Sequence, residues 1–153
     1  MVIPAYVFDR LLEISLLLHA DMARAFAGTG LTASRTHLLW ELHRLGPSTQ
    51  QALASALKVT PRNVTGLVDA LESHGYVERH PHPTDRRAVQ VTLTDRGSRT
   101  MAAMESDREQ AAAELVAGLT EQEVDEFGRI LTSVADRLRR LVEAAADETE
   151  EKT

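Results

Sequence analysis

The sequence predicts a mainly helical α+β protein with one small β-hairpin, and three observations carry this prediction. Apolar residues recur at spacings of three and four along most of the 153 residues, as they do on one face of a helix. Two short segments, residues 76–79 and 88–93, instead alternate apolar and polar residues, as strands with one buried face do. Residues 80–87 between them contain two prolines and two adjacent arginines, which indicates an exposed hairpin tip.

A first helix is expected from about residue 4 to residue 27, where Gly28-Thr29-Gly30 ends it. Its apolar side chains form two stripes: Val7, Leu11, Ile14, Leu18 and Met22 in one, and Phe8, Leu12, Leu16 and Phe26 in the other. A helix that is apolar on two sides needs two partners. We expect one stripe to contact the rest of the chain and the other a second subunit. The next helix is expected to be capped by Thr32 and to end at Gly46-Pro47.

Two helices joined by a short turn should follow. Ser48 and Gln51 have the spacing of a capping box, in which each side chain bonds the backbone N–H of the other, so a helix is expected to begin there. Thr60 and Pro61 indicate a second start, because proline has no N–H to leave unpaired in the first turn. Gly75 is expected to end this second helix in the left-handed conformation. A connection of about three residues is typical of a helix-turn-helix.

The second helix of this pair has a small, polar outer face. The side opposite its apolar residues carries Arg62, Gly66, Asp69 and Ser73, flanked by Asn63, Thr65 and Ala70. This face suits a DNA major groove, where Arg can bind guanine, Asn adenine, and a Thr methyl group thymine. Gly66 costs up to about 1 kcal/mol in a helix, which favours a close approach of DNA there. An ordinary solvated face is the alternative, and Asp69 favours it, because a carboxylate repels phosphate unless it accepts from cytosine or pairs with a cation.

The hairpin tip is too polar to be core. Beside the second helix of the pair, it would lay Arg86 or Arg87 along a neighbouring minor groove, whose negative potential attracts guanidinium. Asp85 is expected to hold one of these arginines in a fixed rotamer and to leave the other for DNA. A surface salt bridge explains the Asp-Arg pair almost as well, but it does not explain a position at the tip of a hairpin that follows a helix-turn-helix.

Three motifs in this segment resemble the winged helix-turn-helix of the MarR family of bacterial transcription regulators. They are Gly-Tyr-Val-Glu-Arg at residues 75–79, Asp-Arg-Arg-Ala at 85–88 and Leu-Thr-Asp-Arg-Gly at 93–97. The resemblance covers nearly the whole chain and departs at the His-Pro-His-Pro entry to the wing, where members often carry charged residues. The residues expected at DNA, some from the resemblance and some from the helix face, are Thr60, Pro61, Arg62, Asn63, Thr65, Gly66, Arg86 and Arg87, with Asp85 supporting the wing.

From residue 95 the chain is expected to return to helix, with a break at Gly118-Leu119 and a second capping box at Thr120 and Glu123. The apolar residues that follow have coiled-coil spacing: Val124, Phe127, Leu131, Val134, Leu138 and Leu141. These C-terminal helices cannot bury their apolar seam alone, so we expect them to pair with a second copy of the chain. The alternative is that the seam packs within the monomer. The expected divisions are an N-terminal dimerisation helix (4–30), a winged helix-turn-helix domain (31–96), C-terminal dimerisation helices (97–146) and an acidic tail (147–153).

Net charge is −6, but base and acid are concentrated in different segments. Residues 31–100 contain nine Lys or Arg against six Asp or Glu, and residues 101–153 contain six against fourteen. The absence of cysteine excludes disulfides and thiolate chemistry. No enzyme motif, cofactor site or apolar run of about 20 residues occurs, so we expect neither an enzyme nor a membrane protein. The expected location is the bacterial cytoplasm, with nucleoid association when DNA is bound.

The resemblance implies a homodimer on a pseudo-palindromic double-stranded DNA operator, most often acting as a repressor; activation stays open. The alternative is a winged-helix module that contacts protein and does not bind specific DNA. The family often binds small amphipathic or phenolic effectors beside the dimerisation helices, and the candidates here are Ser15, His19, His37, Trp40 and Arg44. Core packing of Trp40 and a surface or phosphate role for Arg44 are the favoured alternatives. His80 and His82 lack further ligands for zinc, so no metal is expected.

Overall fold

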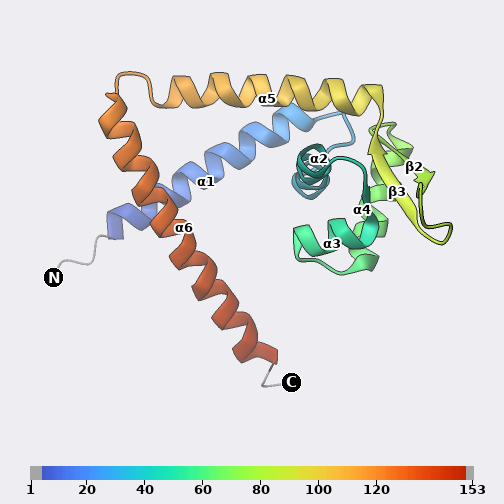
Figure 1. Cartoon of the computed structure of the whole chain (residues 1–153). Coiled ribbons are helices and arrows are strands. Elements are labelled where there is room, and N and C mark those ends of the chain that lie inside the picture. Colours follow the sequence, from blue (N-terminus) through green and yellow to red (C-terminus); the bar gives the residue numbers. More distant parts are fainter. Residues whose placement is uncertain (1–4, 151–153) are drawn as a thin grey trace. The chain divides into compact units, whose positions relative to one another are not determined.

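A computed structural model describes residues 5–150, the side chains of residues 146–150 excepted, as helices and one small sheet (Figure 1). The elements in order are α1 (Ala5–Phe26), α2 (Ala33–Leu45), β1 (Ser48–Thr49), α3 (Gln50–Leu57), α4 (Pro61–Ser73), β2 (Val77–Pro81), β3 (Val89–Leu93), α5 (Asp95–Leu115) and α6 (Glu121–Glu150). The predicted fold class, mainly helical with a β-hairpin wing, is confirmed. In the described part of the chain, no helix combines the length and apolarity that a bilayer span needs.

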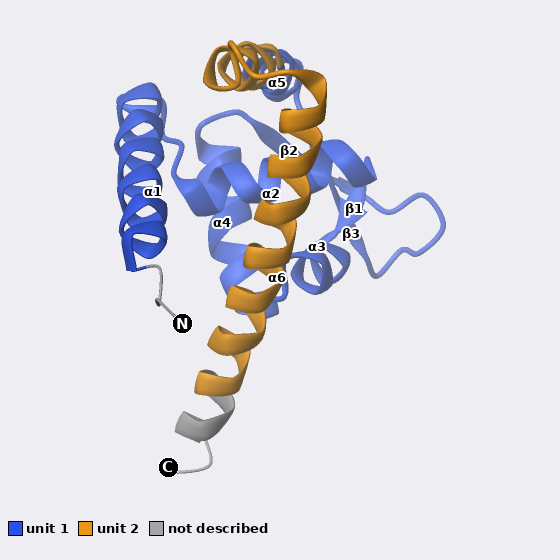
Figure 2. Cartoon of the chain, turned by 90° about the vertical axis from the view of Figure 1, so that its left-hand side faces the viewer, with its two compact units in different colours: residues 1–105 blue, residues 106–153 orange. Residues whose placement is uncertain are grey.

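The chain divides into two compact units, Met1–Glu105 and Ser106–Thr153 (Figure 2). The first unit holds α1 to β3 and the beginning of α5. The second holds the rest of α5 and all of α6.

The core of the first unit lies between α2, α3, α4 and the sheet. Its fully buried side chains are Leu38, Leu39, Leu42, Leu53, Val64, Val68, Leu71, Val77, Val91 and Met101. Burial of each leucine contributes about 1.5–3 kcal/mol relative to exposure. This packing fixes the inner side of α4 and leaves its other side outward.

The sheet has the order β1-β3-β2, with β3 antiparallel to both neighbours. The short strand β1 was not predicted, and it makes the expected capping box at Ser48 and Gln51 wrong. Ser48 is buried, pairs with Val91 in the sheet, and donates its hydroxyl to the Gly46 carbonyl at 2.8 Å. Thr49 caps α3 instead, which therefore begins one residue later than a cap at Ser48 would require.

The other start and stop signals in this segment are confirmed. The hydroxyls of Thr32 and Thr60 cap α2 and α4, and Pro61 occupies the first turn of α4. Gly75 follows the end of α4 with φ of 74°. Lys58 also adopts a left-handed conformation, with φ of 54°, and so makes the tight turn between α3 and α4.

The hairpin is confirmed, but its tip is shorter than expected. His80 and Pro81 were placed in the tip, whereas they pair with Gln90 and Val89 at the end of β2. Proline is tolerated there because it lies at the end of the ladder, where a missing N–H costs little. The tip therefore comprises residues 82–88.

The residues after β3 tie three segments of the first unit together. Arg96 lies over the Tyr76 ring, 4.5 Å from its centroid, and donates to the His74 carbonyl at 2.7 Å. The Tyr76 hydroxyl donates to the Thr29 carbonyl at 2.8 Å. Thr94 donates to the Gly75 carbonyl at 2.6 Å. The turn after α1, the end of α4 and the start of α5 are thereby joined.

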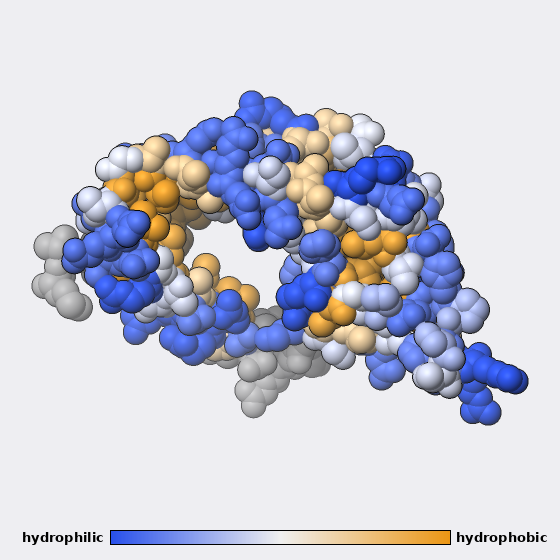
Figure 3. Space-filling view, turned by 45° about the horizontal axis from the view of Figure 1, so that its top comes forward, coloured by the Kyte–Doolittle hydropathy of each residue, from blue (hydrophilic) through white to orange (hydrophobic). Residues whose placement is uncertain are grey.

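The apolar residues of α1 and α6 remain largely at the surface, where hydrophobic patches appear in a space-filling view (Figure 3). The capping box of α6 is confirmed, because the Glu123 carboxylate accepts from the Thr120 N–H at 2.8 Å and the Glu123 N–H donates back to the Thr120 hydroxyl. The acidic tail was expected to begin at Asp147, but α6 continues to Glu150. Residues 151–153 lie outside the described chain.

Candidate nucleic-acid interface

The outer face of α4 presents the predicted residues to solvent. Thr60, Pro61, Arg62, Asn63, Thr65 and Gly66 are all exposed. A Cβ added to Gly66 would meet nothing within 4 Å, so the fold of the described chain does not require a glycine there. Glycine destabilises a helix, and packing within the described chain does not require one at Gly66. A binding partner that comes close to the α4 backbone would explain this glycine.

The wing tip is built by side chains that bond to its own backbone. The Asp85 carboxylate accepts from the Arg87 backbone N–H at 3.0 Å, and the His82 ring nitrogen Nδ1 accepts from the Asp85 N–H at 3.2 Å. Asp85 was expected to hold an arginine side chain, but it supports the turn instead. Among the described residues, the guanidinium groups of Arg86 and Arg87 have no carboxylate partner, so both are available to an outside anion.

Arg79 is the functional candidate that sequence reasoning missed. Its guanidinium contacts the Asp69 carboxylate at 2.5 Å and also pairs with Glu72. The carboxylate that seemed to oppose phosphate is therefore paired with a cation. The missed signal is the strand alternation, because Arg79 shares the face of the buried Val77, where a cation needs a partner.

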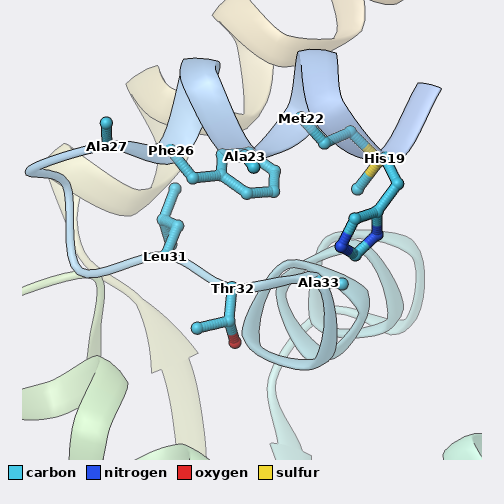
Figure 4. Close-up of a pocket in the computed structure, with 8 residues that line it drawn as sticks. All are labelled: His19, Met22, Ala23, Phe26, Ala27, Leu31, Thr32 and Ala33. Atoms are coloured by element: carbon cyan, nitrogen blue, oxygen red, sulfur yellow. The ribbon is translucent and has the colours of Figure 1, made fainter. Parts of the chain in front are cut away.

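The five effector candidates do not gather around one pocket of the first unit. His19 lines a cavity of about 360 Å³ between the end of α1 and the start of α2, together with Met22, Ala23, Phe26, Ala27, Leu31, Thr32 and Ala33 (Figure 4). The side chains of Phe26 and Leu31 extend into the space between α1 and the chain entering α2.

The other candidates lie elsewhere. His37 lines a separate hollow against Leu57 and Asn63, and Ser15 is exposed on α1. Trp40 packs against the core and makes an edge contact with His43. Arg44 pairs with Glu41 at 2.6 Å. The five predicted effector residues therefore lie in four different places: a cavity, a hollow, the core and the surface.

The histidines of the wing entry do not lie in a metal-ligand cluster. His80 Nε2 is 3.0 Å from a Glu78 carboxylate oxygen, and both side chains are half exposed. In the part of the chain that the structure describes, no three His, Cys, Asp or Glu side chains are grouped as a metal site would require.

The second helix of a core-anchored helix pair is exposed and polar, and it lies next to a hairpin whose two arginines have no carboxylate partner among the described residues. These features define a winged helix-turn-helix protein of the DNA-binding class. The MarR family model matches residues 31–89. The uncharacterized HTH-type transcriptional regulator Mb0904 of Mycobacterium bovis is 34% identical over 113 residues, which cover 74% of this chain and 76% of the relative. The chain belongs to the MarR family and is a DNA-binding transcription regulator.

Two further likenesses agree with this assignment. The HTH-type transcriptional repressor YetL of Bacillus subtilis is 29% identical over 137 residues, which cover 86% of this chain and 80% of the relative. The crystal structure of Streptococcus pneumoniae FabT in complex with DNA matches with a TM-score of 0.80 at 22% identity, covering 90% of this chain and 98% of that chain. At this identity the second likeness concerns the fold alone.

Proposed function

We propose that the protein binds a pseudo-palindromic operator as a homodimer and represses transcription by excluding polymerase. In this proposal α4 enters the major groove through Arg62, Asn63 and Thr65, and Arg86 or Arg87 enters the adjacent minor groove. The observation that carries it is the exposed polar face of α4 beside two arginines that have no carboxylate partner in the described chain. Operator binding takes place in the bacterial cytoplasm, where chromosomal DNA lies.

The homodimer is supported by apolar helix faces that the chain itself leaves open. No residue of α1 is buried, and Phe8 and Leu16 are among its exposed apolar side chains. On α6, Leu131 and Leu138 of the predicted seam are exposed as well. Because exposure of such apolar faces to water is unfavourable, we infer that a second copy of the chain packs against them. Residues 4–30 and 97–146 then form the dimerisation arm, and residues 31–96 the DNA-binding domain.

Release by a small aromatic or amphipathic effector is part of the proposal. The cavity lined by His19 is supported as the effector site by its volume and by Phe26 and Leu31, which supply apolar walls. His19 would supply a hydrogen bond to a polar group. This effector site can be tested by measuring whether aromatic carboxylates displace the protein from DNA. His19→Ala should weaken this displacement.

The test of DNA recognition is titration of purified protein against its upstream intergenic DNA and against nonspecific duplex, at two salt concentrations. Discriminating binding with a protected pseudo-palindrome supports the regulator, and affinity should fall steeply with salt because phosphate contacts release counterions. Equally weak binding to every duplex, followed by failure to select any sequence from random DNA, would favour a protein-contact module.

A further inference from the structure

One side of α4 carries charge that the DNA-binding surface cannot use directly. At about 100° per residue, Pro61, Thr65 and Glu72 fall on one stripe beside the buried face, and Asp69 lies where this stripe meets the outer face of the helix. This stripe faces the start of α3 and strand β2, because its residues bond to Gln50 and Arg79. Two carboxylates so close to a phosphate backbone would oppose binding unless they are neutralised.

Arg79 supplies the neutralising charge from β2. Its guanidinium contacts Asp69 Oδ1 at 2.5 Å and pairs with Glu72, while its backbone N–H donates to the Glu72 carboxylate at 3.2 Å. The side chain is only 23% exposed. Burial alone would lower the pKa of Arg79, but hydrogen bonds and charge from the two carboxylates raise it, so the cation is held there.

The same guanidinium orients a side chain that reaches the recognition surface. Arg79 Nε donates to Gln50 Oε1 at 3.1 Å, which turns the amide nitrogen of Gln50 toward α4. That nitrogen donates to the Thr65 hydroxyl at 2.8 Å. The hydroxyl in turn donates to the Pro61 carbonyl at 3.0 Å. Thr65 is exposed and its hydroxyl is engaged on both sides, so its methyl group is the part of the side chain that is left to contact a base.

We propose that Arg79 is a positioning residue for DNA recognition: it neutralises the α4 carboxylates and, through Gln50, holds Thr65 so that its methyl group meets a thymine methyl in the major groove. This inference rests on the proposed function, and it deepens that function by naming what Thr65 reads. Strand β2 then has two roles: it leads to Arg86 and Arg87 at the wing tip, and through Arg79 it neutralises the carboxylates of α4.

The first experiment tests the charge role on an operator selected from random DNA with the wild-type protein. Arg79→Met should weaken binding by at least about tenfold, since it leaves two unpaired carboxylates beside the DNA. The triple variant Arg79→Met, Asp69→Asn, Glu72→Gln should recover most of this loss. Far-UV circular dichroism and melting temperature of each variant separate the effect from misfolding. A triple variant that binds as weakly as Arg79→Met would overturn the charge role.

The second experiment tests the Thr65 contact. Each operator thymine is replaced in turn by deoxyuridine, which lacks only the methyl group. The wild type should lose affinity at one thymine per half-site, and Thr65→Ser, which removes only the methyl group, should no longer distinguish the two bases there. Gln50→Leu and Arg79→Met should weaken the same discrimination. Arg79→Lys should recover part of the affinity, because it keeps the charge, but less of the discrimination, because it lacks the fork that orients Gln50.

The outcomes separate this inference from the proposed function. If the wild type selects no sequence, the proposed function fails and this inference fails with it. If it selects and protects an operator but Thr65→Ser responds to deoxyuridine as the wild type does, only the Thr65 assignment is wrong.

Discussion

Gly97 in α5 lies directly against the backbone carbonyl of Tyr76, so that a Cβ at Gly97 would come within 2.0 Å of the oxygen. Only a hydrogen atom fits, and this contact sets the start of α5 against the residue that precedes β2. Gly97→Ala should therefore lower the free energy of unfolding by about 1–3 kcal/mol, the usual cost of overpacking. Urea denaturation of the full-length protein measures it, and an unchanged midpoint would show that the backbone can yield.

Gly66→Ala is the matched substitution, and it should act in the opposite direction on stability. Nothing lies within 4 Å of the added Cβ, so the helix should gain up to about 1 kcal/mol from alanine. DNA affinity should nevertheless fall, because the methyl group would separate α4 from the groove. Urea denaturation and operator titration on the same preparation test the pair of effects. Unaltered affinity would mean that DNA does not approach Gly66.

The wing offers a way to separate charge from conformation. Arg87→Ala should cost about 1–3 kcal/mol of DNA binding and reduce the salt dependence, while the tip persists because Asp85 bonds only the backbone of residue 87. Asp85→Ala should also weaken binding, although it removes an acid, because the tip loses that bond.

Arg129→Ala on α6 removes a cation outside the winged segment and serves as the control, expected to bind normally. Tighter binding by Asp85→Ala would show that its charge matters more than its turn.

Acid should loosen the start of α6. The Thr120 backbone N–H, and then its hydroxyl, lower the pKa of Glu123 below its ordinary value of 4.5. Because the folded pKa is below the unfolded one, the stabilisation is present above about pH 4.5 and is lost as the pH falls through the folded pKa. Helical circular dichroism should therefore drop less with acid in Glu123→Ala than in the wild type. Parallel curves would exclude a contribution from the cap.

The α6 seam can be tested by one charge on each side of the helix. Leu138, at 57% exposure, lies on the seam, whereas Ser133 lies opposite it. Leu138→Glu should shift the protein toward monomer in sedimentation or light scattering, because a carboxylate in an apolar interface must be desolvated. Ser133→Glu adds the same charge and should leave the assembly unchanged. Equal behaviour of the two variants would place the interface elsewhere.

Much of the fold follows from local sequence. The caps at Thr32, Thr60 and Thr120, the left-handed Gly75 and the hairpin depend on residues a few positions apart, so their chemistry is legible in the chain. The exposed residues of the α4 face follow in the same way, since helical periodicity places them opposite Val64 and Leu71.

Contacts between distant segments could not be read in this way. The strand β1 exists because Ser48 meets Val91, 43 positions along the chain, and that pairing moved the α3 cap from Ser48 to Thr49. The effector candidates shared a helix stripe or a region in the sequence, but in the fold His19 lines a cavity between α1 and α2, His37 lines a separate hollow, and Trp40 packs against the core, as the favoured alternative expected. Local patterns cannot choose between such partners.

By itself, the sequence determined the helices, most of their ends, the wing and the family, because each rests on short-range periodicity or a compact motif. Only the tertiary structure decided whether the negative charge of Asp69 is paired. In the sequence it is an acid on a surface expected to meet phosphate; in the fold it is paired with Arg79, whose Nε also bonds Gln50, 29 positions away. The physical reason is that the charge of a surface depends on which side chains packing brings within a few ångströms.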